Sequence, residues 1–219
     1  MGFYRVIPWE VRKALIYFMA LTKAQKSAIV GMVLGDGFLQ STGKKNARLR
    51  LEHSLKQQEF LKWKMSLVPQ FFQNFPSQLT RIHPITKRKY AYIRAQSHSS
   101  PFLGKLKSVF YPKGKKKIPE NLTRYLRHPL GLAIWYLDDG YYYKRDKIAE
   151  LYLGRVSKKE AEIARRAIKE RFGIEARLKD KKNKGFVLSF SPEQTQKFAR
   201  LIKKFVIKSM NYKLPSLTP

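Results

Sequence analysis

The sequence predicts an α+β fold in which one αββαββα unit is written twice around a pseudo-twofold axis. Two similar apolar stretches, IVGMVLGDG at 29–37 and LAIWYLDDG at 132–140, each end in an aspartate followed by a glycine. After each stretch, the same order of alternating strands and amphipathic helices follows, which indicates an internal duplication. With 46 Lys+Arg against 15 Asp+Glu, the 219-residue chain has a net charge of +31 and must carry a strongly positive surface.

The first half is expected over 22–112, after an N-terminal extension at 1–21 whose apolar stretch 14–21 reads as a helix that packs on the core. Thr22 and Gln25 have the capping-box spacing that begins a helix. We then expect strands FLQST and NARLRLEHS joined at 43–45, a helix over 56–67, strands QLTRIHP and KYAYIRAQS joined at 86–88, and a helix over 101–111.

A basic linker is expected at 113–128, and the second half at 129–208 repeats the order of the first. Its predicted elements are a motif helix from Pro129, strands YYYKRD and IAELYLGRV, a helix over 157–172 capped by Ser157, strands IEARLKD and GFVLSFS, and a helix after Ser191. The C-terminal tail, 209–219, is expected to return to the centre of the molecule.

The two apolar stretches read as buried helices, and the sequence places a carboxylate at the end of each. Gly37 and Gly140 are expected to let the chain leave the helices in a conformation that β-carbons disfavour. If the helices pack side by side, Asp36 and Asp139 meet. Because like charges repel at short range, such a pair indicates oxygen ligands for a hard divalent cation such as Mg²⁺. The small residues expected to allow this packing are Gly31, Gly35, Ala28 and Ala133.

Both stretches resemble the LAGLIDADG motif of homing endonucleases, with the eighth-position aspartate and the ninth-position glycine present each time. The first copy also has the third-position glycine, Gly31, whereas the second has Ile134 there. The phrases KKKIPENL at 115–122 and MNYKLP at 210–215 resemble the branch that includes the omega intron endonuclease. The resemblance covers roughly residues 25–215 and implies the homing endonuclease fold, with two antiparallel saddle-shaped sheets and a central two-helix interface.

The resemblance implies that Asp36 and Asp139 bind metal and share two or three Mg²⁺ ions, with Gly35 and Asp138 next to them contributing backbone carbonyl groups or balancing charge. A local turn bond at the helix end is the alternative for the two aspartates, although the helix dipole disfavours a carboxylate there. The resemblance also implies that Lys116 and Lys213 lie beside the metals and orient water or stabilise the charged phosphate. Lys116 stands in a run of three lysines, any of which could instead contact phosphate.

Strands with one polar, positively charged face can lie in the major groove of DNA, where arginine pairs with guanine and glutamine with adenine. The alternative is a solvated sheet face. Candidates for base contact are Gln40, Arg48, Arg50, Arg81, His83, Arg94 and Gln96 in the first half and Tyr143, Arg145, Arg155, Arg177 and Lys179 in the second. Candidates for phosphate contact at the hairpin tips are Lys44, Lys45, Lys87, Arg88, Lys181, Lys182 and Lys184.

Several other functions are disfavoured by the sequence. No apolar stretch reaches the eighteen or so residues that a membrane span needs. The absence of cysteine excludes disulfides and thiolate metal sites, and fits an intracellular setting, in an organelle or a prokaryotic cytoplasm. The four histidines lack metalloenzyme spacing, and there is no phosphate-binding loop for ATP.

We therefore expect a monomeric DNA endonuclease that needs no protein partner and makes a double-strand break for intron or intein homing. If each half covers one helical turn, the double-stranded site has about 20 base pairs and is not palindromic. The resemblance implies cleavage across the minor groove. The alternatives are an RNA maturase that assists intron splicing and a non-cleaving DNA-binding protein of the same fold.

Overall fold

The structure, a computed structural model, describes residues 21–216. The helix expected in the N-terminal extension lies outside these residues, apart from Leu21. The first half contains α2 (Lys23–Leu34), β1 (Phe38–Ser41), β2 (Ala47–Ser54), α3 (Gln58–Leu67), β3 (Ser77–Ile82), β4 (Lys89–Gln96) and α4 (Pro101–Phe110). The second half contains α5 (Pro129–Asp139), β5 (Gly140–Tyr143), β6 (Ile148–Gly154), α6 (Lys158–Phe172), β7 (Arg177–Asp180), β8 (Phe186–Phe190) and α7 (Pro192–Ile202).

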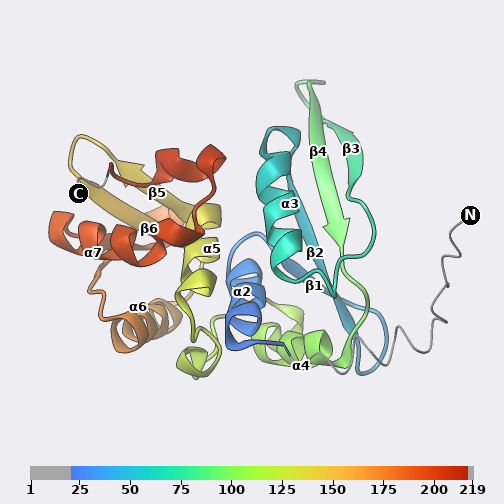
Figure 1. Ribbon diagram of the computed structural model, residues 1–219, viewed down its shortest axis with the longest axis horizontal. Helices are drawn as coiled ribbons and strands as arrows, with labels where there is room; N and C mark the ends of the chain where they lie inside the picture. Colours follow the sequence, from blue (N-terminus) through green and yellow to red (C-terminus); the bar gives the residue numbers. More distant parts are fainter. Residues whose placement is uncertain (1–20, 217–219) are drawn as a thin grey trace, which may run out of the picture.

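Each half builds one four-stranded antiparallel sheet. The strand order is β1-β2-β4-β3 in the first sheet and β5-β6-β8-β7 in the second, so the two sheets have the same topology. The two central helices, α2 and α5, lie side by side between the halves (Figure 1). The predicted fold class, a duplicated αββαββα unit around two central helices, is confirmed.

The close approach of α2 and α5 depends on two glycines. A β-carbon added to Gly31 would lie 2.2 Å from the carbonyl oxygen of Gly131, and one added to Gly131 would lie 2.3 Å from the carbonyl oxygen of Ser27. Gly131 stands just before the second motif stretch, so it supplies the small residue that the stretch itself lacks at Ile134. The hydroxyl of Ser27 also donates to the carbonyl oxygen of His128 at 3.0 Å, which ties the N-terminal ends of the helices together.

The expected backbone role of the two motif-ending glycines is wrong. Gly140 has φ −89° and ψ 156°, which any residue can adopt, and Gly37 does not have a positive φ either. Crowding explains both glycines instead. A β-carbon at Gly37 would lie 2.4 Å from the carbonyl oxygen of Met32, and one at Gly140 would lie 2.2 Å from the ring of Tyr136.

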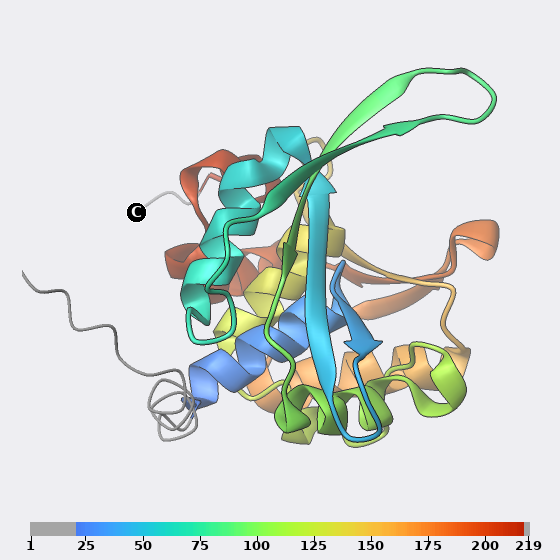
Figure 2. The same cartoon turned by 90° about the vertical axis from the view of Figure 1, so that its right-hand side faces the viewer.

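Local sequence signals account for the element boundaries. Thr22 and Gln25 form the predicted capping box of α2, and Ser157 and Glu160 form one at the start of α6. In β2, buried residues alternate with partly exposed ones, so one face of the strand packs on the helices and the other faces outward. The β3–β4 hairpin extends well beyond the rest of the first sheet (Figure 2).

Across residues 21–216, no helix combines the length and the apolar character needed to cross a bilayer.

Candidate active site

The two motif aspartates stand at the same end of the central helices. Asp36 follows α2 and its side chain is 48% exposed, whereas Asp139 is the last residue of α5. Burial, and then the negative charges of Asp138 and Asp36, raise the pKa of Asp139 to about 7. Partial burial and the charge of Asp138 raise the pKa of Asp36 as well. A cluster of carboxylates whose ionised forms are disfavoured is a site that a bound cation would stabilise.

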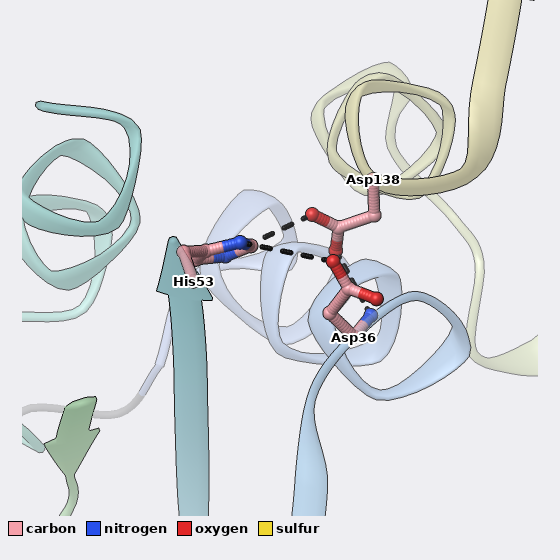
Figure 3. A group of neighbouring side chains, drawn as sticks. All are labelled: Asp36, His53 and Asp138. Atoms are coloured by element: carbon pink, nitrogen blue, oxygen red, sulfur yellow. Dashed lines mark hydrogen bonds and ion pairs between the residues drawn. The ribbon is translucent and has the colours of Figure 1, made fainter. Parts of the chain in front are cut away.

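The carboxylate of Asp138 crosses from α5 into the first half. Its side chain is completely buried and forms an ion pair with Lys64 of α3, which is also completely buried. Its Oδ2 accepts a hydrogen bond from the backbone N–H of Asp36 at 3.2 Å. Asp36, His53 and Asp138 point toward one another in Figure 3, and one ligand atom from each lies within 4.8 Å of the others.

His53 and Lys64 were not among the residues predicted from the sequence. His53 Nδ1 lies 3.7 Å from Asp36 Oδ2, and its Nε2 lies 3.0 Å from Lys64 Nζ. Burial and the charge of Lys64 lower the pKa of His53 to about 3, so the ring is neutral. For each of the two residues, the sequence contains a pattern that could have indicated a buried position. His53 continues the inward-facing positions of β2, and Lys64 shares the buried stripe of α3 with Phe60 and Leu61.

The structure brings Lys116 and Lys213 to corresponding places at the ends of the two motif helices. Lys116 Nζ donates to the carbonyl oxygen of Gly35, the residue before Asp36. Lys213 Nζ donates to the carbonyl oxygens of Leu137 at 2.7 Å and Asp138 at 3.1 Å, next to Asp139. Lysines commonly cap helix C-termini in this way.

Burial lowers the pKa of both Lys116 and Lys213, while the nearby aspartates oppose this shift. The C-terminal tail therefore returns to the centre, as the sequence predicts, at least as far as Lys213. Because each ammonium group is anchored to helix-end carbonyl groups, both positive charges stay beside the carboxylates at a fixed place.

Asp139 opens into a cavity of about 350 Å³ that lies between the second sheet and the end of α2. Its lining includes Gly35, Lys116, Trp135 and Tyr152. Among residues 21–216, no ion pair involves the carboxylate of Asp139. The carboxylate oxygens of Asp36 and Asp139 are of the hard, charged kind that Mg²⁺ and Mn²⁺ prefer as ligands.

In the first sheet, six of the seven predicted base-contacting residues share one face around Glu52. Arg50 pairs with Gln96 across the strands, and Arg48 Nη1 donates to Gln96 Oε1 at 2.9 Å. Arg81 and Arg94 contact Glu52 at 2.6 and 2.8 Å, so one carboxylate holds both guanidinium groups side by side. Gln40 belongs to the same face, because it is the cross-strand partner of Arg48.

The second sheet has a similar arrangement built from different residues. Lys179 and Lys181 contact the buried Glu150 at 3.1 and 3.4 Å. The hydroxyl groups of Tyr143 and Tyr152 are 2.7 Å apart, next to the same glutamate. Arg177 is paired with Ser189, the cross-strand partner of Glu150, and so lies on this face.

The remaining candidates lie at loops around the two faces. Arg145 is 91% exposed and pairs with Asp146, while Arg155 Nε donates to the carbonyl oxygen of Asn183 at 3.3 Å. His83 Nδ1 accepts from two backbone N–H groups in the β3–β4 turn, so this nitrogen stabilises the turn. The hairpin tips carry Lys44 and Lys45, Lys87 and Arg88, and Lys182 and Lys184, all of which are exposed.

Comparisons with known proteins agree with this architecture. RecA of Mycolicibacterium fallax is 26% identical over 208 residues, which is 89% of this chain and 47% of that protein. The probable intron-encoded endonuclease 1 of Wickerhamomyces canadensis is 25% identical over 199 residues, which is 89% of this chain and 85% of that protein. The chain therefore spans about half the length of the RecA proteins and most of the length of the second relative.

Two solved structures share the fold. The homing endonuclease I-WcaI bound to its DNA recognition sequence superposes with a TM-score of 0.84, at 22% identity, over 100% of this chain and 97% of that one. A variant of I-DmoI in complex with its target DNA, in the presence of manganese, superposes with a TM-score of 0.52, at 12% identity, over 81% of this chain and 92% of that one. The model of the LAGLIDADG DNA endonuclease family matches residues 26–198. The chain belongs to the LAGLIDADG DNA endonuclease family.

Proposed function

We propose that the protein is a site-specific DNA endonuclease that makes a double-strand break by metal-dependent hydrolysis of phosphodiester bonds. One observation supports this proposal above all. Two carboxylates lie at the ends of α2 and α5, and two lysines donate hydrogen bonds to carbonyl groups at the same helix ends, from positions that lie far apart in the sequence. The members of this group are Asp36, Asp139, Lys116 and Lys213.

The carboxylates of Asp36 and Asp139 would hold the divalent cations, Mg²⁺ being the expected ion, in a group of two or three. When bound, such ions polarise the scissile phosphate and lower the pKa of a water molecule. The raised pKa of both carboxyl groups supports this assignment, because a bound cation would offset the burial and the repulsion that raise it. Gly35 and Asp138 would contribute through their backbone carbonyl groups, since the Asp138 carboxylate is already paired with Lys64.

The two lysines perform the part of the chemistry that the protein itself supplies. As a phosphodiester bond is attacked, negative charge accumulates on the phosphate oxygens. The ammonium groups of Lys116 and Lys213, held in place by helix-end carbonyl groups, offset that charge without having to reorganise.

The two sheet faces are proposed to read double-stranded DNA in the major groove. Each presents a carboxylate flanked by two cations, which are arginines in the first sheet and lysines in the second. Because the two faces differ in side chains, the halves of the site differ in sequence, and the whole site of about 20 base pairs is not palindromic. A single chain contains both halves, so we propose a monomer that needs no protein partner.

Homing of an intron or an intein is the proposed biological role. The similarity to a probable intron-encoded endonuclease supports the intron, and an intein remains equally compatible with the chain's own residues. An intracellular setting follows from a DNA substrate in either case.

The test is selection of cleaved duplexes from a randomised DNA pool with Mg²⁺, followed by cleavage of the selected site in Mg²⁺ or EDTA. We expect linear product only with Mg²⁺, and loss of at least about 100-fold in rate for Asp36→Asn and Asp139→Asn. Glu193→Gln, a substitution on the outer surface of α7, serves as the control for charge. Tight binding of intron RNA without cutting of any DNA would favour the maturase instead.

A further inference from the structure

We propose that His53 is a positioning residue for Asp36, held in place by Lys64, and that it makes the two halves of the active site unequal, so that the two DNA strands are cut at different rates. This inference rests on the proposed endonuclease function and adds to it. It concerns two buried residues, His53 and Lys64, that lie outside the sequence motifs.

The contacts of His53 assign its tautomer. Lys64 Nζ lies 3.0 Å from His53 Nε2. An ammonium group has three donors and no acceptor, so Nε2 must accept and the ring proton must sit on Nδ1. That N–H group faces Asp36 Oδ2 at 3.7 Å.

Asp36 is therefore oriented from two sides. Its backbone N–H donates to Asp138 Oδ2, and its side chain faces the Nδ1–H of His53. The latter distance exceeds a normal hydrogen bond, so the ring acts on the carboxylate through its dipole and needs only a small shift to bond directly. The Asp36 side chain is 48% exposed, and His53, whose side chain is 3% exposed, is its neighbour on the buried side.

Lys64 is itself fixed. Its ammonium group pairs with the completely buried carboxylate of Asp138 and lies 4.3 Å from the centre of the Phe60 ring. Gly35 makes room for this arrangement, because a β-carbon there would lie 2.3 Å from Asp138 Oδ2. The cluster thus joins both halves of the chain and holds the His53 ring in one orientation.

The second half lacks such a cluster. The pairing of the first two strands in each sheet makes Leu151 equivalent to Leu51, and counting onward from there puts Leu153 at the position of His53 and Ala164 at that of Lys64. In the motif copies, Gly35 stands at the position of Asp138. Leu153 lines the cavity next to Asp139 and has no group that can donate a hydrogen bond. Asp139 is therefore oriented without the help that Asp36 receives, although both belong to equivalent motif copies.

The experiment follows each strand separately, using the selected duplex labelled on either strand. For His53→Leu, which installs the residue of the other half, we expect one strand to be cut about 10-fold to 100-fold more slowly and the other to stay within about threefold. Nicked plasmid should accumulate. His53→Asn, which keeps an N–H donor near the position of Nδ1, should restore most of the lost rate. His53→Val provides a second deletion of the donor, and Leu153→Met is the matched control in the second half.

Equal slowing of both strands, or no change in either, by the two donor deletions would overturn the inference, provided that wild-type protein cuts the duplex. Failure of the wild type to cut any duplex would contradict the endonuclease proposal itself. A readout that does not depend on activity is the ¹⁵N spectrum of the labelled histidines without metal. We expect the Nδ1–H tautomer for His53 and a change of tautomer populations in Lys64→Met. An Nε2–H tautomer in the wild type would also overturn the inference.

Discussion

Gly31 and Gly131 face each other across the interface of the central helices with no room for a β-carbon between them, since one added to Gly31 would lie 2.2 Å from the carbonyl oxygen of Gly131. The contact is between two backbones, so neither helix can yield by rotating a side chain. The distance between the helices, and with it the distance between the carboxylates at their ends, depends on these two residues.

Substitution of alanine for either glycine should therefore destabilise the protein. We expect Gly31→Ala and Gly131→Ala each to lower the free energy of unfolding by about 1–3 kcal/mol, because the backbones must separate. Urea unfolding measures the change. Gly43→Ala is the matched control, since a β-carbon there meets nothing within 4 Å, and it should stay within about 0.5 kcal/mol of the wild type. Equal effects at all three positions would contradict the close packing.

The stability of the metal-free protein should fall as pH rises through the range in which Asp139 ionises. Its pKa is about 7 when folded and near 3.8 when unfolded, so the folded state binds the extra proton. The stabilisation is complete below pH 4 and is lost as pH rises to about 7. In EDTA, the free energy of unfolding of Asp139→Asn minus that of the wild type should increase by on the order of 2 kcal/mol from pH 5 to pH 8. Urea unfolding at pH 5 and pH 8 tests this. The same difference in stability between variant and wild type at both pH values would contradict the prediction.

Replacing only one member of the buried pair of Lys64 and Asp138 should destabilise the protein more than replacing both. Lys64→Met leaves a buried carboxylate without its cation, and we expect a loss of about 3–5 kcal/mol. The double variant Lys64→Met/Asp138→Leu should recover a large part of that loss, since two apolar side chains can fill the same space. A double-mutant cycle by chemical denaturation measures the coupling, and additive effects would show that the two residues are independent.

The shared carboxylate of Glu52 should contribute to DNA specificity rather than to affinity. In Glu52→Gln, Arg81 and Arg94 lose the anion that holds them together, and the sheet face becomes more positive. We expect tighter binding to unrelated DNA and a specificity ratio lower by about 10-fold. Fluorescence anisotropy with selected and scrambled duplexes at one salt concentration measures both. Glu193→Gln makes the same change of charge on α7 and should leave the ratio unaltered.

The run of lysines at 115–117 offers a test of register. Only Lys116 donates to the carbonyl oxygen of Gly35, so Lys116→Met should reduce the cleavage rate by about 100-fold or more with little change in DNA binding. Lys115→Met should reduce the rate much less, because among residues 21–216 the Lys115 ammonium group makes no hydrogen bond to the end of α2. Single-turnover cleavage at saturating enzyme separates chemistry from binding. Similar losses for both variants would contradict the assignment of a catalytic role to Lys116.

Much of the fold could be predicted because its signals are local. The capping boxes at Thr22 and Ser157, the turn residues of the hairpins and the alternation in β2 each depend on neighbours in the sequence. The repeated order of elements then defines a duplicated unit. The places of Lys116 and Lys213 followed from short phrases that resemble a known family, and the structure brings both lysines to the helix ends.

The buried cluster could not be predicted in this way. His53 and Lys64 interrupt apolar patterns. A polar residue on a buried face indicates that a hydrogen-bonding partner is needed, but the pattern does not identify that partner. That partner is Asp138, which lies in the other half of the chain. Gly37 and Gly140 show the same limit, because glycine is needed there to avoid clashes with nearby side chains and carbonyl groups, and not to form the turn that the sequence indicates.

The sequence by itself thus determined the order of elements, the duplication, the positive charge and the two motif carboxylates, because these depend on residue identity and spacing along the chain. Only the tertiary structure decided that Gly131 completes the helix contact, that Asp138 pairs with Lys64, and that Asp36 and Asp139 have different neighbours. Each of these is a contact between residues remote in sequence, whose existence depends on how closely the two halves pack.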